Sequence, residues 1–186
     1  MIPKILQREN TVLRKISDSV PPEEVRSEKI QSVIRDMSEA LSAQDDGVAI
    51  AAPQIGVLLR IFLLSEKVAG ALENENKETP DKKISLPRVF VNPVIVKRSR
   101  EKHSVEEGCL SVRYAYGMMK RAKKVTVRAL DAEGTPFERG ASGLLAQIFQ
   151  HEIDHLNGIL FIDSATAIRE LTQEELARER EQLEEK

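Results

Sequence analysis

Apolar residues first recur at helical spacing between residues 23 and 43. Five apolar side chains there fall on one face of a helix with 3.6 residues per turn: Ile30, Val33, Ile34, Met37 and Leu41. Two prolines and two acids at residues 21–24 suit the first turn of a helix, and Asp45-Asp46-Gly47 is typical of a turn. The pattern predicts a helix over residues 23–43.

After this stretch the pattern changes to short apolar runs at residues 48–52, 58–64 and 88–96, which are typical of strands. Asn92-Pro93 interrupts the third run, and a proline within a strand marks an edge or a bulge. Residues 66–87 are mostly charged and polar without a period, so we expect a surface excursion there. Residues 124–130 alternate like a strand, and residues 131–134 read as the turn after it.

The strongest helical pattern covers residues 142–157, which are apolar on most sides and therefore predict an interior helix. Gly158 is well placed to end that helix. Thr172 and Glu175 match a capping box that opens a charged C-terminal helix, assigned to residues 165–186. Without a repeat or a linker, residues 1–186 are expected to form a single α+β domain.

Composition narrows the class of protein. The chain has 186 residues, 41% of them hydrophobic and 31% charged, with a formal net charge of -2. This balance gives no long-range attraction to nucleic acid or membranes, although it leaves room for a local basic patch. One cysteine excludes an internal disulfide, and the first residues lack the apolar core of a signal peptide. We therefore expect a cytoplasmic protein with no direct nucleic-acid motif and no membrane segment.

The clearest chemical motif is His151-Glu152-Ile153-Asp154-His155 on the predicted interior helix. Residues four apart share a helix face, so both imidazoles can reach one metal ion with Glu152 beside it. The HExxH pattern also occurs by chance in proteins that bind no metal. Two of only three histidines in the chain lie in this pair, however, and a carboxylate among apolar residues needs a partner.

Two histidines leave such a metal short of the three protein ligands that a catalytic site usually has. Downstream glutamates, including Glu170, Glu174 and Glu175, would supply a third ligand in a thermolysin-like protease. Upstream, the sole cysteine, Cys109, follows a glycine. A lone cysteine is most often a small buried hydrophobic residue, so residue chemistry alone leaves both alternatives open.

Three separated motifs resemble those of the peptide deformylase family. Residues 47–56, Gly-Val-Ala-Ile-Ala-Ala-Pro-Gln-Ile-Gly, resemble the family's GxGxAAxQ motif. Residues 107–111 reproduce its EGCLS motif, and residues 150–155 reproduce its QHExDH motif. The resemblance extends over about residues 5–162. It implies a mostly antiparallel sheet packed around the helix with the HExxH motif.

The resemblance also implies a function: metal-dependent removal of the formyl group from the N-terminal formyl-methionine of newly made proteins. Its metal ligands would be Cys109, His151 and His155, holding one divalent ion. The family implies Fe(II), with Zn, Ni or Co as substitutes. Glu152 would act as general base and then acid, while the side-chain amide of Gln54 and the backbone N–H of Leu110 would stabilise the oxyanion.

By the same resemblance, Glu107 supports the metal loop with Arg121 as its partner. Seven residues are expected to contact the substrate: Gly47, Val48, Ala49, Tyr116, Leu144, Gln147 and Ile148. The chain departs from the family pattern at Ala49, normally a glycine, at Arg113, normally a proline, and at Gln147, normally apolar. We expect these departures to affect substrate affinity and methionine preference rather than catalysis.

The partners implied are N-formyl-methionyl nascent peptides. The ribosome is a further candidate partner, although the C-terminal segment gives it no support because acids outnumber bases there from residue 165 onward. Two other functions compete with this interpretation. One is a zinc metalloprotease with a downstream glutamate as ligand, and the other is a catalytically inactive binder of formylated peptides.

Overall fold

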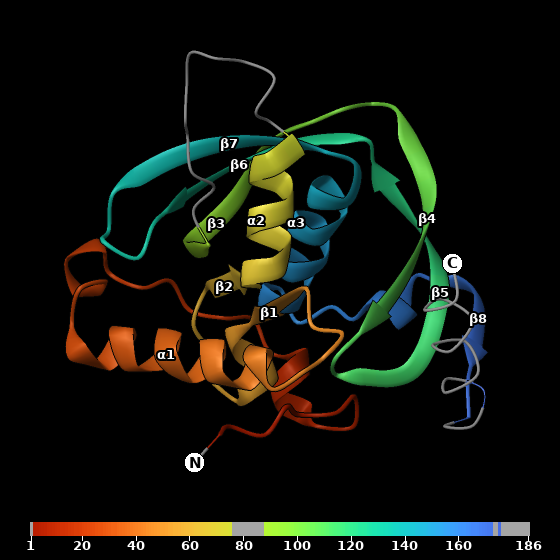
Figure 1. Cartoon of the computed structure of the whole chain (residues 1–186), viewed down its shortest axis with the longest axis horizontal. Helices are drawn as coiled ribbons and strands as arrows, with labels where there is room; N and C mark the ends of the chain where they lie inside the picture. Colours follow the sequence, from red (N-terminus) through yellow and green to blue (C-terminus); the bar gives the residue numbers. More distant parts are fainter. Residues whose placement is uncertain (1, 76–87, 173–174, 176–186) are drawn as a thin grey trace.

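The computed structural model describes residues 2–75, 88–172 and 175 (Figure 1). Within them the longer helices are α1 (Glu28–Ser42), α2 (Glu66–Glu75) and α3 (Gly143–Leu156). The strands are β1 (Ala49–Ala51), β2 (Ile61–Leu64), β3 (Val89–Arg98), β4 (Lys102–Cys109), β5 (Val112–Ala122), β6 (Lys124–Leu130), β7 (Pro136–Ser142) and β8 (Thr166–Glu170). Short 3-10 turns connect several of these elements.

The strands form two antiparallel sheets on either side of α3. The order is β1-β2-β3-β6-β7 in the five-stranded sheet and β4-β5-β8 in the three-stranded sheet. Helix α3 contacts strands of both sheets and lies between them (Figure 1). The predicted α+β architecture, with antiparallel strands around the HExxH helix, is therefore confirmed.

Aromatic packing fixes α3 against the larger sheet. The Phe62 and Phe90 rings stack with their centroids 4.4 Å apart, and Phe149 of α3 meets Phe90 edge-on at 4.9 Å. All three side chains are fully buried. Such aromatic pairs contribute roughly 0.5–1.5 kcal/mol each beyond the burial of their area. The helix that holds the histidines is thus set in a rigid core.

The end of α3 confirms the predicted role of Gly158. This residue has a φ of 73°, a conformation that glycine adopts without the steric cost of a Cβ. Its N–H donates to the carbonyl of His155 at 3.0 Å, as expected for a glycine that ends a helix. A Cβ there would lie 2.7 Å from the carbonyl oxygen of Arg14, so only glycine fits. The helix ends at Leu156, one residue after its motif.

The predicted start of the first helix is wrong. Pro22–Glu24 form a separate 3-10 turn, and α1 begins at Glu28. Ser27 caps the helix because its hydroxyl accepts a hydrogen bond from the N–H of Ile30 at 3.4 Å. The prolines and acids therefore mark the shorter turn, and the true cap is a serine within the predicted span.

The missing period over residues 66–87 predicts a surface excursion without regular structure, but α2 forms in its first half. Ser65 caps this helix by accepting a hydrogen bond from the N–H of Val68 at 3.3 Å. Val68 packs against the main core and Ala69 is buried, which stabilises a helix of low apolar content. Residues 76–87 of the predicted excursion lie outside the described residues.

The predicted helix over residues 165–186 is replaced at its start by β8, which pairs with β5. The segment that leads into β8 lies close to β5, since a Cβ on Gly117 of β5 would lie 2.8 Å from the Cβ of Ala165. The capping box itself forms, with the N–H of Thr172 donating to Glu175 at 2.7 Å and the N–H of Glu175 donating back to the Thr172 hydroxyl. Residues 173–174 and 176–186 lie outside the described residues.

Candidate metal centre

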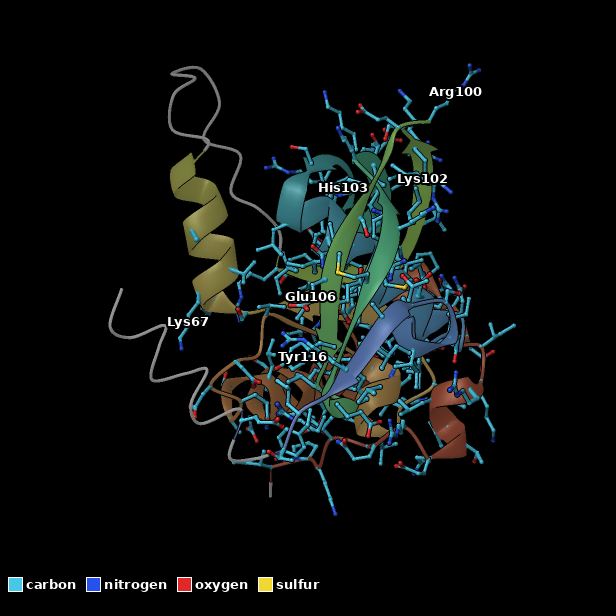
Figure 2. The ribbon with its side chains drawn as sticks, turned by 90° about the vertical axis from the view of Figure 1, so that its right-hand side faces the viewer. Lys67, Arg100, Lys102, His103, Glu106 and Tyr116 are labelled. Carbon is cyan, nitrogen blue, oxygen red and sulfur yellow. The ribbon has the colours of Figure 1, made fainter. Side chains whose placement is uncertain are left out.

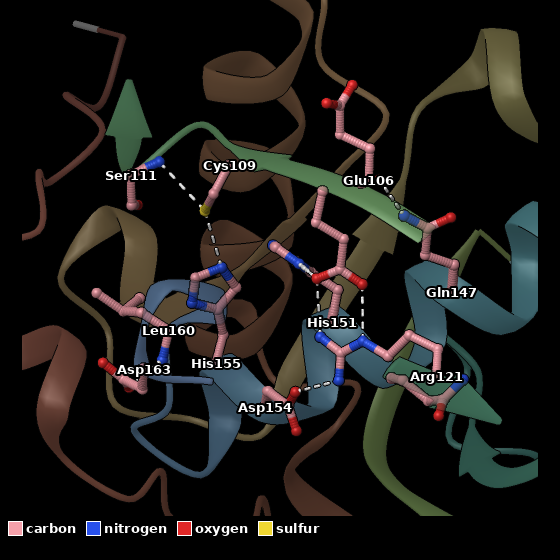
Figure 3. A network of polar contacts seen from close by, with 12 residues as sticks. Glu106, Cys109, Ser111, Arg121, Gln147, His151, Asp154, His155, Leu160 and Asp163 are labelled. Atoms are coloured by element: carbon pink, nitrogen blue, oxygen red, sulfur yellow. Dashed lines mark hydrogen bonds and ion pairs between the residues drawn. The ribbon is translucent and has the colours of Figure 1, made fainter. Parts of the chain in front are cut away.

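Helix α3 places three motif side chains together at its C-terminal half. His151 and His155 are four residues apart, and their ring centroids are 4.9 Å apart. His155 and Glu152 are buried, with relative exposures of 1% and 4%. The face that His151 and His155 share is directed at β4 and the loop after it (Figure 3).

Cys109, at the end of β4, completes a set of three. Its sulfur lies 3.2 Å from Nε2 of His155, and one ligand atom from each of Cys109, His151 and His155 lies within 4.8 Å of the other two (Figure 3). The N–H of Ser111 donates to the same sulfur at 3.4 Å. The structure therefore brings together the three side chains that the motifs predict as ligands.

Glu107 links this set to a buried network of charges. Arg121 donates from Nε and from an Nη to the two carboxylate oxygens of Glu107, at 2.7 and 2.8 Å. Nδ1 of His151 lies 2.9 Å from the same carboxylate, and Arg121 also reaches Asp154 of α3 at 2.5 Å (Figure 3). The predicted partnership of Glu107 with Arg121 is confirmed.

This network sets both the charge and the orientation of its members. Burial alone would raise the pKa of Glu107, but hydrogen bonds from Arg121 and His151 outweigh it and lower that pKa to about 2. Glu107 is thus a permanent carboxylate, and it occupies Nδ1 of His151. The other ring nitrogen of that histidine is left for a metal, as in many carboxylate–histidine–metal arrangements.

We expect a Glu107→Gln variant to bind a divalent ion about 10–100-fold more weakly, since the substitution removes the charge that orients His151. It should also lose about 3 kcal/mol of stability, because Arg121 stays buried and, in the described part of the chain, keeps Asp154 as its single charged partner. Chelator competition and urea unfolding measure the two effects. Glu106→Gln, at the exposed acid next in the chain, is the matched control, and equal losses in both variants would contradict the assignment.

The donor set fits a divalent cation. Burial opposes ionisation of Cys109, yet the nearby His155 charge and hydrogen bonds from both histidines lower the pKa of the thiol well below its ordinary value. A thiolate and two imidazoles are ligands that Zn and Fe(II) accept. Among the described residues, Oε2 of Glu152 and Nδ1 of His155 are buried without a hydrogen-bond partner. A bound ion with its water would satisfy the glutamate oxygen.

Glu152 has the properties of a proton acceptor. Its burial raises the pKa of the carboxyl to about 7, despite the opposing charges of His151 and His155. A carboxyl with a pKa near neutrality can both take and return a proton at physiological pH. Its position on the same helix, between the two histidines, places it beside any ion that they hold.

Gln54 is held at the site by both ends of its amide. Its carbonyl accepts from the N–H of Ala51 at 2.8 Å, and its Nε2 donates to the hydroxyl of Ser111 at 3.1 Å and lies 3.7 Å from the Cys109 sulfur. Leu110 lies between Cys109 and Ser111, and its carbonyl accepts from Gln7 at 3.1 Å. The two predicted oxyanion donors therefore flank the predicted ligand Cys109.

A cavity of about 310 Å³ opens beside these groups. Gln54, Cys109, Leu110, His151 and Glu152 line it. So do six of the seven residues predicted to contact substrate, namely Val48, Ala49, Tyr116, Leu144, Gln147 and Ile148. Gly47 does not line this cavity. It packs instead against the end of α1, where a Cβ would lie 2.6 Å from Leu41.

The comparisons with known proteins now decide the family. Residues 2–170 match the sequence model of the family described as "Polypeptide deformylase". The chain belongs to this family. The peptide deformylase of Pseudothermotoga lettingae is 40% identical over 163 residues, which cover 88% of this chain and 82% of that protein. Peptide deformylase 2 of Clostridium acetobutylicum is 42% identical over 158 residues, covering 85% and 91%.

Solved deformylase structures agree. A peptide deformylase from Legionella pneumophila superimposes with a TM-score of 0.72 at 40% identity, covering 100% of this chain and 95% of that one. The enzyme from Thermotoga maritima gives 0.74 at 31% identity, covering 89% and 99%. Members of the family are metal-dependent hydrolases that remove the formyl group from formylated peptides. The predicted family and enzyme class are confirmed.

The sequence does not predict three contacts at the deformylase site. Ser111 receives the Gln54 amide, and Asp154 gives Arg121 a second carboxylate. Arg113, recognised only as a departure from the family pattern, pairs with Asp46 at 2.9 Å and also contacts Gln44, so it ties β5 to the loop before β1. A signal existed for Asp154, which lies one helical turn after His151.

In the part of the chain that the structure describes, no helix has the length and apolar character needed to cross a membrane.

Proposed function

We propose that Cys109, His151 and His155 hold one divalent ion and that Glu152 transfers the proton in hydrolysis of an N-terminal formyl group. The observation that supports this most directly is the convergence of three ligand atoms within 4.8 Å of one another. Beside them lies a buried glutamate oxygen that has no hydrogen-bond partner among the described residues. A catalytic site of this type has three protein ligands and leaves one position open for water.

When bound, a divalent ion supplies an activated water and polarises the formyl oxygen. Glu152 takes the proton of the attacking water and returns it to the leaving amine, as its pKa of about 7 allows. The ligand role and the proton-transfer role belong to different residues. The Glu107 carboxylate holds His151 in orientation throughout.

Gln54 and Leu110 stabilise the negative charge that develops on the formyl oxygen. The Gln54 amide lies 3.7 Å from the Cys109 sulfur, and Leu110 is the next residue after that cysteine, so both are near the bond that breaks. Fixed donors cost no reorganisation during the reaction, and one of them contributes about 3–4 kcal/mol to lowering the barrier. The apolar cavity wall receives the side chain of the first residue.

The substrates we propose are N-formyl-methionyl peptides, as they emerge from the ribosome in the cytoplasm. We propose Fe(II) as the native ion because the family implies it, with Zn, Ni or Co as substitutes that the same thiolate and imidazole ligands accept. Formate release from a formyl-methionyl peptide by anaerobically purified protein, with the metal measured in the same sample, tests this. Cleavage of an internal peptide bond without formate release would favour a metalloprotease instead.

Gln147 is expected to reduce discrimination in favour of methionine. It lines the cavity one turn before His151, and its amide donates to the carbonyl of Glu106 at 2.8 Å. A Gln147→Leu variant presents an apolar wall, which should raise the ratio of kcat/KM for formyl-Met over formyl-Gln peptides by about tenfold. The ratio of formyl-Met to formyl-Leu serves as the internal control and should change less. An unaltered Met-to-Gln ratio would exclude Gln147 from the specificity pocket.

A further inference from the structure

The chain crosses twice between the two sheets, and the two crossings lie side by side. One joins β3 to β4 through residues 99–101, and the other joins β5 to β6 at Lys123. The N–H of Ser99 donates to the carbonyl of Lys124 at 2.9 Å, and the N–H of Lys123 donates to the carbonyl of Glu101 at 3.0 Å. The Ser99 hydroxyl adds bonds to both segments. This end of the molecule is therefore a rigid backbone platform.

The platform concentrates positive charge. We define the basic surface as seven side chains on these crossings and the adjoining strand ends: Lys97, Arg98, Arg100, Lys102, Lys120, Lys123 and Lys124. Six of them are exposed, and Lys123 is half-buried and paired with Glu101, the acid of the platform. The other six form no ion pair with any residue that the structure describes. The whole chain has a net charge of -2, so this charge is strongly segregated.

We propose that the basic surface binds the phosphate backbone of double-helical RNA. Closely spaced cations on a rigid frame repel one another, and a polyanion relieves the repulsion while releasing its condensed counterions. The choice of RNA rests on the proposed function, since formylated nascent chains are found where structured RNA is abundant. The argument for binding itself rests on the charge of the basic surface and on the rigid backbone platform that carries it.

The composition of the surface favours duplex RNA over single-stranded nucleic acid and over an apolar partner. Single-stranded nucleic acid is bound largely by stacking its bases on aromatic side chains, and residues 97–103 and 120–124 contain no Phe, Tyr or Trp. A specific protein interface has an apolar or aromatic core, and stable attachment to a membrane adds an apolar or lipid anchor to a basic patch. The exposed large hydrophobic residues of the described chain all lie outside these two segments. Duplex RNA, which is recognised largely through its phosphates and shape, needs neither feature.

Strand β4 connects the basic surface to the metal centre. It runs from Lys102 to Cys109, and seven steps at roughly 3.3 Å per residue separate the two by about 23 Å. Figure 2 shows Arg100 and Lys102 at one end of the molecule, with Glu106 and Tyr116 further along toward the cavity. RNA bound at the basic surface would therefore leave the cavity open to a peptide.

The test compares two triple variants of the full chain that change its net charge equally. Lys97→Glu, Lys102→Glu and Lys124→Glu reverse three charges of the basic surface. Lys4→Glu, Lys15→Glu and Lys29→Glu reverse three exposed lysines elsewhere that likewise have no ion pair in the described part of the chain. Fluorescence anisotropy of a labelled RNA duplex of about 20 base pairs is measured against salt concentration. Formate release from a formyl-methionyl dipeptide is measured on the same samples.

We expect the parent and the control variant at Lys4, Lys15 and Lys29 to bind RNA with affinities within about threefold of each other. Both affinities should fall steeply with salt. The basic-surface variant should bind about tenfold or more weakly, with a log–log salt slope shallower by about two to three. All three proteins should release formate at the same rate, which separates this proposal from the proposed function. Equal loss of RNA binding in both variants would overturn the proposal, as would binding by the parent to anionic lipid vesicles but not to RNA.

Discussion

Replacement of Glu152 by alanine is expected to lower kcat/KM for a formyl-methionyl peptide by about 10²–10⁴-fold, while the protein retains its metal. The variant loses the carboxylate whose pKa of about 7 suits it to exchange protons with water and with the leaving amine. The ligands Cys109, His151 and His155 are unaltered. Because Oε2 of Glu152 is buried without a hydrogen-bond partner among the described residues, the substitution leaves no hydrogen-bond partner of that oxygen unpaired.

The measurement pairs steady-state kinetics with metal analysis of the same preparation. Glu106→Gln is the matched control, because Glu106 also lines the cavity but lies exposed on β4, away from the histidines. This control should keep activity within a few-fold of the parent. A Glu152→Ala protein that released formate at the parental rate would show that another group transfers the proton. Loss of the metal together with activity would instead make Glu152 a ligand.

Replacement of Cys109 by alanine is expected to remove most of the bound metal and, with it, more than 99% of the activity, about a hundredfold loss. Two imidazoles alone hold a divalent ion weakly, and the substitution takes away the anionic ligand. The sulfur also accepts a hydrogen bond from the N–H of Ser111, so the loop after β4 loses an anchor. Metal content after dialysis against a mild chelator gives the readout.

A Cys109→Ser variant separates the loss of the metal from the loss of the hydrogen bond that anchors the loop after β4. Serine keeps an acceptor for the Ser111 N–H but binds soft metals poorly because its hydroxyl is not ionised at neutral pH. We expect metal loss close to that of alanine, with a smaller change in thermal stability. Full metal occupancy in the alanine variant would exclude Cys109 from the ligand set and restore a downstream glutamate as the alternative.

The sequence predicts well those features that depend on local pattern. The helix that contains His151 and His155 is found within one residue at each end, because its apolar pattern and Gly158 agree. Strand β6 matches its predicted range, since alternation of side chains marks a sheet with one buried face. The ligand set needed the family resemblance, because residue chemistry alone could not choose between Cys109 and a glutamate.

The errors arise where tertiary contacts override the local pattern. Strands β4 and β7 were not predicted, as both contain many polar residues and pair with neighbours that supply the apolar contacts. Helix α2 forms because Val68 reaches the core from a mostly charged segment. The close pairing of β8 on β5 depends on Gly117, and the sequence does not reveal which segment approaches that glycine.

The salt-bridged cluster of Glu107, Arg121 and Asp154 joins β4, β5 and α3 through side chains of the protein itself. Zinc fingers, in contrast, are unfolded until their metal arrives. In this chain β4, β5 and α3 are also held by buried ion pairs between side chains, so we expect the fold to survive removal of the metal by a chelator. We then expect the protein to exchange one cation for another without unfolding, with an activity that follows the supply of transition metals around it.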